Sequence, residues 1–188
     1  MKEFISVSVE DVLEMMRLDH RLLRVLPEES VTAELCLAAV LEDGDALEYV
    51  PEPCLTQELC LAAVQASSSA IRYVPEQFRT PELYRTAVLG GPIWQAVEHI
   101  PSEMLTPELY LEAVLKDGDA LEYVPKRLRT PELCLAAVQN DGSALEYVPV
   151  HLITPELWLA AVQNDGSALK YVPYHLRTPE LCRAATGK

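Results

Sequence analysis

The chain has 188 residues, of which 49% are hydrophobic, and this content is ample for a packed core and argues against intrinsic disorder. Fifteen basic and 29 acidic residues give a formal net charge of -14 at pH 7, which repels nucleic-acid phosphates and anionic membrane surfaces. No apolar run approaches the roughly 20 residues of a membrane span, and five carboxylates stand in the first 20 residues, where a signal peptide needs an apolar stretch. We therefore expect a cytoplasmic protein that binds neither nucleic acid nor membranes directly.

One 24-residue pattern recurs along the chain. It is clearest from Thr130, where TPELCLAAVQNDGSALEYVPVHLI is followed by TPELWLAAVQNDGSALKYVPYHLR. A fixed period in this range is typical of stacked repeat architectures, in which each unit contacts its neighbours. We predict a single all-α solenoid domain over residues 1–188, built from short helical hairpins. Its units are 8–31 (an N-terminal cap), 32–55, 56–79, 80–105 (with a two-residue insertion), 106–129, 130–153, 154–177 and 178–188 (a C-terminal half-unit cap).

Each unit contains the signals of two helices, as the unit at Thr130 illustrates. Threonine is a preferred N-cap, proline is tolerated at the first helical position, and a first helix over Pro131–Asn140 is expected. Gly142 then accepts the left-handed conformation that ends a helix, and Ser143 caps a shorter second helix. Pro149 stops that helix, and two or three loop residues lead to the next threonine.

The first helix of each unit is apolar on almost all sides. In the unit at Thr130, Leu135 and Ala136 widen the apolar surface, so we expect this helix to be buried on both sides. Cysteine recurs at the fifth position of the unit, where tyrosine or tryptophan stands elsewhere, which indicates packing rather than disulfides. Cys54 occupies another apolar position and is also expected in the core. A strand-based leucine-rich repeat is the competing interpretation, but the units lack the L-x-L alternation.

The motif T-P-E-L-x-x-x-A-V, a turn with glycine, and then A-L-x-Y-V-P carries a resemblance over nearly the whole chain. It resembles a family of tandem helical repeats, a domain of unknown function found in bacterial and giant-virus proteins. A weaker similarity is to the leucine-rich repeat variant, whose alternating α and 3₁₀ helices imply a right-handed superhelix. The family resemblance implies no catalytic residue and no cofactor.

Departures from the repeat are the candidates for a binding function. The fourth unit carries Gly90-Gly91-Pro92 in place of the usual turn, which should push Ile93 and Trp94 out of the regular stack. An exposed tryptophan there could anchor a partner, because tryptophan is enriched at interface hot spots. The alternative is a tolerated insertion with Trp94 packed over the turn.

In each unit, the proline that stops the second helix, such as Pro149, is followed by two residues that vary freely from unit to unit. Such variation on a constant scaffold can tune recognition. The pairs run from acidic to basic and aromatic along the chain, and Lys126, Arg127 and Arg129 cluster in one loop. Together with Ile93 and Trp94, the partner-binding candidates are Glu28, Glu29, Glu52, Lys126, Arg127, Arg129, His151, Tyr174 and His175.

These patterns contain no group of residues typical of an enzyme active site. His151 and His175 stand one unit apart, too far to share a metal ion, and no serine, cysteine or carboxylate partner is implied by spacing. We expect no metal, no cofactor and no enzymatic activity. The predicted function is a repeat scaffold that binds an unidentified protein as a monomer, with head-to-tail association as a further option. The alternative is an acidic mimic of nucleic acid that inhibits a nucleic-acid-binding protein, because residues 25–71 contain nine carboxylates and no lysine or arginine.

Overall fold

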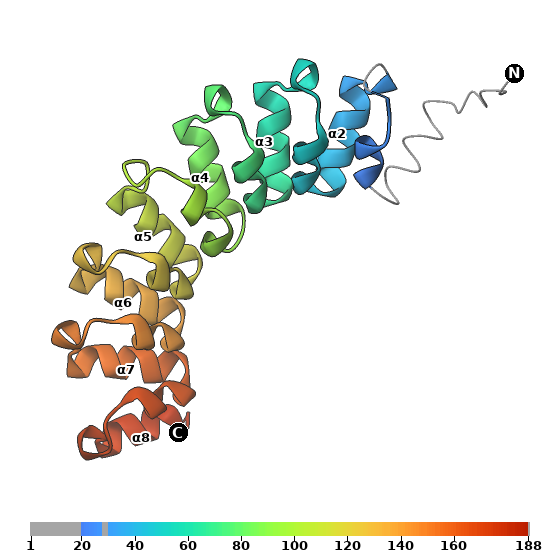
Figure 1. Ribbon diagram of the computed structural model, residues 1–188. Helices are drawn as coiled ribbons and strands as arrows, with labels where there is room; N and C mark the ends of the chain where they lie inside the picture. The colour runs from blue at the N-terminus through green and yellow to red at the C-terminus, as the bar shows by residue number, and fades with distance from the viewer. Residues whose placement is uncertain (1–19, 28–29, 188) are drawn as a thin grey trace, which may run out of the picture. The chain divides into compact units, whose positions relative to one another are not determined.

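The computed structural model describes residues 20–27 and 30–187, and within these residues every regular element is a helix (Figure 1). The all-α repeat fold predicted from the sequence is therefore confirmed. The described residues form two compact units, one extending to Gly91 and including Glu98–Ile100, and the other comprising Pro92–Val97 and the residues from Pro101 onward. We call them the first and second units and treat each separately. The single-domain organisation, the repeat boundaries and the right-handed superhelix remain predictions, and most of the predicted cap 8–31 lies outside the described residues.

Seven α-helices recur at the repeat spacing within the described residues. In the first unit they are α2 (Ala33–Glu42), α3 (Gln57–Ala66) and α4 (Pro81–Gly90). In the second unit they are α5 (Pro107–Lys116), α6 (Pro131–Asn140), α7 (Pro155–Asn164) and α8 (Pro179–Ala185). Each helix packs beside the next within its own unit, as Figure 1 shows for α2 to α4 and for α5 to α8.

Short 3₁₀ helices connect the α-helices. A first set follows α2, α3, α5, α6 and α7 closely and comprises η3 (Gly44–Tyr49), η5 (Ser68–Tyr73), η9 (Gly118–Tyr123), η11 (Gly142–Tyr147) and η13 (Gly166–Tyr171). A second set precedes the next α-helix and comprises η4 (Glu52–Cys54), η6 (Glu76–Phe78), η10 (Lys126–Leu128), η12 (Val150–Leu152) and η14 (Tyr174–Leu176). The remaining ones are η1 (His20–Arg24), η7 (Ile93–Gln95) and η8 (Val97–His99).

The prediction of a helical hairpin was therefore incomplete, because a regular repeat has three helices. The segment after each proline was expected to be a loop, and it instead turns once as a 3₁₀ helix. In η12, for example, the N–H of Leu152 donates to the carbonyl of Pro149 at 2.8 Å, which is the i to i+3 bond of that helix type. The two variable residues are the first two residues of this turn.

The α-helices begin where their caps predict. The N–H of Leu133 donates to Oγ1 of Thr130 at 3.2 Å, which satisfies one of the unpaired amides of the first turn of α6. Pro131 occupies the next position, where its missing N–H costs nothing. The predicted bounds of this helix, Pro131–Asn140, are those that the structure has.

The capping of the first 3₁₀ helix differs from the prediction. Asp141, and not Ser143, is the N-cap of η11, because Oδ1 of Asp141 accepts from the N–H of Ser143 at 2.8 Å. Gly142 was expected in a left-handed conformation, but in the described chain only Gly187 has a positive φ. A Cβ on Gly142 would lie 2.4 Å from the carbonyl oxygen of Ala161 in the next α-helix. Glycine is therefore needed for close packing between repeats.

Each α-helix buries one face, and the prediction that it is buried on both sides was wrong. In α6, Leu133, Cys134, Ala137 and Val138 are buried, whereas Leu135 is 37% exposed. The matching leucines Leu37 and Leu111 are 43% and 41% exposed. The fold thus leaves a row of partly exposed leucines, one for each of these helices.

The cysteine predictions hold for the interior repeats. Cys36, Cys60 and Cys134 are fully buried, as expected of a packing position. Cys182 holds the same position in α8 but is exposed. Cys54, expected in the core, is only half-buried, and its thiol lies 3.8 Å from the carbonyl oxygen of Val31. All five are free thiols.

Candidate protein-interaction surface

The variable residues of the repeat lie at the surface, on the second set of 3₁₀ helices or, for Ser102-Glu103, on the hydrogen-bonded turn that takes its place before α5. In the second unit they form four consecutive pairs, which we call the variable edge. Both members of every pair are exposed: Ser102-Glu103, Lys126-Arg127, Val150-His151 and Tyr174-His175. The proline before each pair ends the preceding extended segment, so the pair occupies the first two positions of the turn.

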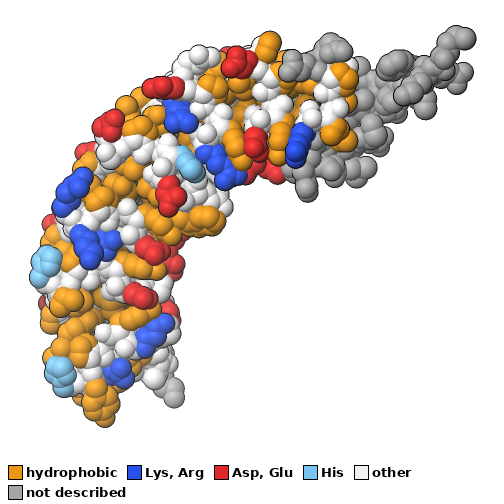
Figure 2. Space-filling model, viewed as in Figure 1, with side chains coloured by type: hydrophobic (Ala, Val, Ile, Leu, Met, Phe, Trp, Pro, Cys, Tyr) orange, Lys and Arg blue, Asp and Glu red, His pale blue; other side chains and the backbone are white. Residues whose placement is uncertain are grey.

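The variable edge combines basic and apolar side chains that the fold does not bury. Val150 and Tyr174 are each 86% exposed, which is unusual for large apolar groups. Arg177 lies over the Tyr174 ring, with its guanidinium carbon 5.8 Å from the ring centre. Figure 2 shows Lys, Arg and His side chains along the outer edge of the second unit, interspersed with hydrophobic ones. Five of the predicted binding residues therefore lie on one edge: Lys126, Arg127, His151, Tyr174 and His175.

The two candidate residues of the two-residue insertion, Ile93 and Trp94, differ in exposure. Trp94 is 56% exposed, so more than half of its surface is accessible, and its role as a partner anchor remains a prediction. Ile93 is only 4% exposed, so the prediction that both residues leave the stack was wrong for Ile93. An aliphatic side chain at this position is more stable in the core than in water. Ile93 is therefore not part of the candidate surface.

Arg129 was predicted to bind a partner together with Lys126 and Arg127, but its guanidinium donates to backbone carbonyls of its own repeat and of the next one. Nε donates to the carbonyl of Val124 at 2.8 Å, Nη2 donates to the carbonyl of Glu122 at 2.9 Å, and Nη1 donates to the carbonyl of Tyr147. Arg79 and Arg177 stand at the same repeat position, and the Nε of each donates to the valine carbonyl five residues earlier. The arginine of this position therefore ties the 3₁₀ segments together.

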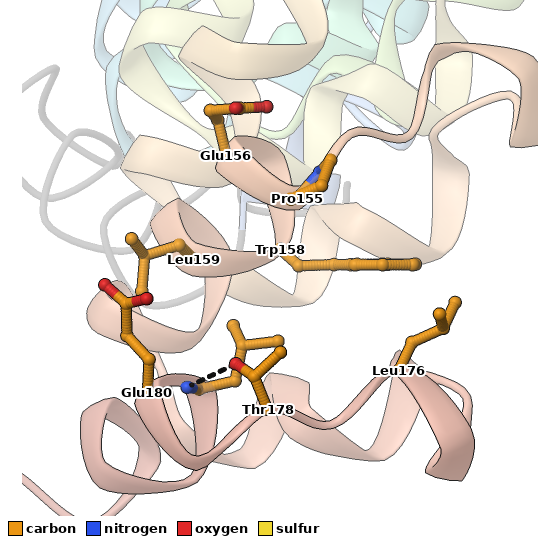
Figure 3. Close-up of a pocket in the computed structure, with 8 residues that line it drawn as sticks. Pro155, Glu156, Trp158, Leu159, Leu176, Thr178 and Glu180 are labelled. Carbon is orange, nitrogen blue, oxygen red and sulfur yellow. Dashed lines mark hydrogen bonds between the residues drawn. The ribbon is translucent and has the colours of Figure 1, made fainter.

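A groove opens where the N-terminal turns of α7 and α8 meet. Its volume is about 320 Å³, and it is lined by Pro155, Glu156, Trp158, Leu159, Leu176, Thr178, Glu180 and Leu181. Figure 3 shows Trp158 and Leu159 extending from α7, with Leu176 at the end of η14 and Glu180 in the first turn of α8 below them. The Leu181 N–H donates to Thr178 Oγ1 at 3.2 Å, and this bond caps the start of α8 beside the groove. Trp158 Nε1 is buried and lacks a hydrogen-bond partner among the described residues.

The same groove recurs at equivalent places in the repeat. Between α5 and α6 it has a volume of about 210 Å³ and is lined by Pro107, Glu108, Leu111, Leu128, Thr130, Glu132 and Leu133. Between α2 and α3 in the first unit it has about 180 Å³ and is lined by Ala33, Leu37, Cys54, Thr56, Glu58 and Leu59. In the second unit we call the two grooves the N-terminal grooves. Each lies beside a 3₁₀ helix of the variable edge, because Leu128 and Leu176 end η10 and η14.

The N-terminal grooves have an anionic rim. Glu108 and Glu156 stand in the first turns of α5 and α7, where the helix dipole favours an anion. Hydrogen bonds from its own N–H and from the Thr106 hydroxyl lower the pKa of the Glu108 carboxyl. Its counterpart Glu156 also has a lowered pKa, through its own N–H and the Thr154 hydroxyl. Both carboxylates are therefore firmly ionised at neutral pH beside an apolar floor.

The first unit has a different surface. Its predicted candidate Glu52 is exposed, as are Glu34, Glu42, Glu48 and Glu58. Arg72 forms an ion pair with Asp45 at 2.6 Å, and Ser69 Oγ donates to the same carboxylate at 2.7 Å. The predicted candidates Glu28 and Glu29 lie outside the described residues.

The described side chains also bear on two other kinds of site. No three His, Cys, Asp or Glu side chains in residues 20–27 and 30–187 converge as metal ligands. Burial, with a smaller effect of nearby Cys54, raises the pKa of the Cys36 thiol to about 12, and burial raises that of Cys60 to about 11. Such thiols stay protonated at neutral pH and are poor nucleophiles.

Among the helices that the structure describes, none has the length and apolar character needed to cross a membrane.

The grooves are the part of the surface that the sequence reasoning missed. The leucine of each groove was assigned to the core because its helix is apolar on nearly all sides. A signal was present, since the same repeat position holds Arg85 in α4 and Arg183 in α8. A position that accepts arginine in two repeats is not a fully buried one.

Comparison with known proteins addresses the repeat itself. The family model described as "Domain of unknown function (DUF4116)" matches residues 32–79 and 106–153. Each match spans two predicted 24-residue repeats, and together they cover about half of the chain. No curated protein and no solved structure matches the chain. The predicted bacterial and giant-virus distribution and the similarity to the leucine-rich repeat variant remain predictions. By the extent of the match, the chain belongs to the DUF4116 family of tandem repeats.

Proposed function

We propose that the chain is a non-enzymatic repeat scaffold in the cytoplasm and that its variable edge binds another protein. The observation that carries the proposal is the exposure of every pair on that edge while the surrounding positions are nearly constant between repeats. Exposed apolar side chains such as Val150 and Tyr174 cost free energy in water and gain it on burial by a partner. Trp94 is a separate exposed anchor candidate in the same unit.

The non-enzymatic character is part of this proposal. The grooves are lined mainly by leucine, proline and threonine side chains, with glutamates at the rim. The ionised Glu108 and Glu156 have lowered pKa values, which is the opposite of what a general acid requires at neutral pH. The buried thiols with raised pKa values are likewise unsuited to nucleophilic attack.

The test is affinity capture from lysate of the source cells by the intact chain, with quantitative mass spectrometry. One variant carries the exposed Glu-Gln pair of η6, Glu76-Gln77, in place of Lys126-Arg127, Val150-His151 and Tyr174-His175. Because η6 occupies the same place in its own repeat and already carries this pair, the variant should fold. Its matched control carries Glu122→Gln and Glu146→Gln, exposed carboxylates on η9 and η11.

Loss of a captured protein by the edge variant, with retention by the control, is expected. A capture profile that is identical for all three proteins would contradict the proposal. A folded edge variant is recognised by an unchanged circular dichroism spectrum and melting temperature.

An acidic nucleic-acid mimic is the second candidate, and it is favoured by the exposed carboxylates of the first unit. If the chain is a mimic, replacing Glu34, Glu48 and Glu52 by lysine should abolish capture of a nucleic-acid-binding protein, because the basic surface of such a partner binds negative charge. Trp94→Ala should leave a mimic's capture unchanged. The opposite pattern, sensitivity to Trp94 alone, would eliminate the mimic.

A further inference from the structure

The leucines of the N-terminal grooves are not required by the fold. Leu111 is 41% exposed and Leu159 is half-buried, although both stand on helices whose other face supplies the core. Arg85 and Arg183 hold the same repeat position in α4 and α8, so the repeat folds with a charged residue there. The leucine side chains in the second unit therefore supply apolar surface at a position where packing does not demand it.

The charge around these leucines has a definite sign. Glu108 and Glu132 line the groove between α5 and α6, and Glu156 and Glu180 line the groove between α7 and α8. All four are exposed. An occupant of these grooves therefore meets an apolar floor beside a row of carboxylates, and a lysine or arginine near its apolar groups would be attracted to that row.

The spacing of the grooves suits an extended chain. The two grooves are separated by two repeats, and packed helices lie roughly 8–10 Å apart, so their separation is roughly 16–20 Å. An extended polypeptide advances about 3.3 Å per residue, so five or six residues span this distance. Between the grooves the segment would pass Leu135, which is 37% exposed.

We propose that the N-terminal grooves of the second unit bind one extended segment of a partner protein, with two large apolar side chains about six residues apart and lysine or arginine beside them. This inference rests on the proposed scaffold function and specifies the class of partner. The variable edge runs alongside the grooves and would contact the rest of the partner.

The test uses a fluorescein-labelled synthetic peptide of about 12 residues, with leucines six positions apart, a lysine next to each leucine, and serine elsewhere. Fluorescence anisotropy with the intact chain should show saturable binding. Replacement of either leucine by serine should weaken binding about tenfold or more, because one apolar anchor is lost. Replacement of the lysines by glutamate should weaken it further, and added salt should reduce the difference between the two peptides.

The protein variants are Leu111→Arg and Leu159→Arg, which introduce the residue already present at this position in α4 and α8. Each should reduce peptide affinity about tenfold or more while the melting temperature changes little. Glu156→Gln with Glu180→Gln should weaken only the lysine-containing peptide, and the control Glu122→Gln with Glu146→Gln should have no effect.

Equal affinity for the designed peptide and its leucine-free version, or for wild type and both arginine variants, would overturn the inference. That failure differs from failure of the scaffold proposal. If lysate capture still depends on the variable edge, only the groove assignment is wrong. If capture depends on neither surface, the scaffold proposal fails as well.

Discussion

Asn164 links two consecutive repeats through the backbone of Gly142. Its Oδ1 accepts a hydrogen bond from the Gly142 N–H at 2.9 Å, and its Nδ2 donates to the carbonyls of Gln139 and Asn140 at 2.8 and 3.1 Å. One side chain at the end of α7 thus satisfies unpaired carbonyls at the end of α6 and an amide at the start of η11. Asn140 does the same one repeat earlier, with the Gly118 N–H at 3.0 Å and the Leu115 carbonyl at 2.7 Å.

Asn164→Ala should lower the free energy of unfolding by about 1–2 kcal/mol, because the buried Gly142 amide loses its acceptor. Urea denaturation followed by circular dichroism measures the change. Gln163→Ala is the matched control, since Gln163 is exposed in the same last turn of α7. Equal stability of the two variants would show that water replaces the asparagine without cost.

Gly142→Ala should lower the free energy of unfolding by roughly 2–3 kcal/mol, because the new Cβ would collide with the Ala161 carbonyl and force the repeats apart. The comparison is Gly187→Ala. A Cβ on Gly187 has open space around it, and the cost there is about 1 kcal/mol for its left-handed backbone. If Gly187→Ala proved the more destabilising, backbone conformation and not close packing would explain the glycines of the repeat.

Asp119→Ser should stabilise the chain at pH 7, by roughly 0.2–0.5 kcal/mol because the carboxylate is exposed and screened. Partial burial, followed by the nearby Asp141, raises the pKa of Asp119 above its ordinary value of 3.8. The folded chain therefore holds this proton more tightly than the unfolded chain. The resulting penalty is fully present above the folded pKa and disappears as the pH falls to the unfolded value.

The gain from Asp119→Ser should accordingly shrink between pH 7 and pH 4 in thermal melts at low salt. Serine is the natural residue at this repeat position in η11 and η13. Asp45→Ser is the control of opposite sign, because it removes the ion pair with Arg72 and should destabilise by about 0.2–1 kcal/mol. A gain that is constant over this pH range would rule out the carboxylate charge as its cause.

Thiol labelling should separate the cysteines by position. Cys182 is exposed and Cys54 is half-buried, so both should react with a maleimide in the native protein. Cys36, Cys60 and Cys134 are buried, and burial raises the pKa of each thiol, so they should react only after unfolding. Peptide mapping by mass spectrometry gives the reactivity of each site. Rapid native labelling of Cys134 would contradict its assignment to the core.

Local signals in the sequence were sufficient to predict the α-helices. Thr130 and Pro131 define where α6 begins, and the structure begins and ends that helix at the predicted residues. The second set of 3₁₀ helices could not be predicted in the same way. In η12 and η14, for example, a proline precedes two variable residues and a leucine, and neither helix has a side-chain cap. A single turn of this kind is held by backbone bonds that no particular side chain specifies.

Contacts between repeats account for the predictions that were wrong. The glycine at position 142 was assigned to a turn conformation, but its reason lies in the Ala161 carbonyl of the next repeat. Leu135 was expected to be buried because its helix is apolar on almost all sides, and periodicity alone does not show which apolar face the neighbouring repeats cover. The variable pairs, in contrast, were predictable as surface residues because comparison between repeats separates constant positions from variable ones.

The most direct test of the central claim places a photoreactive p-benzoylphenylalanine at position 174 on the variable edge of the intact chain. The same residue at position 163, which is exposed on α7 away from the pairs, is the control. After irradiation in source cells, position 174 should give a covalent adduct with a specific protein, and position 163 should not. Absence of any adduct at 174, or the same adducts from both positions, would contradict a protein-binding role for this edge.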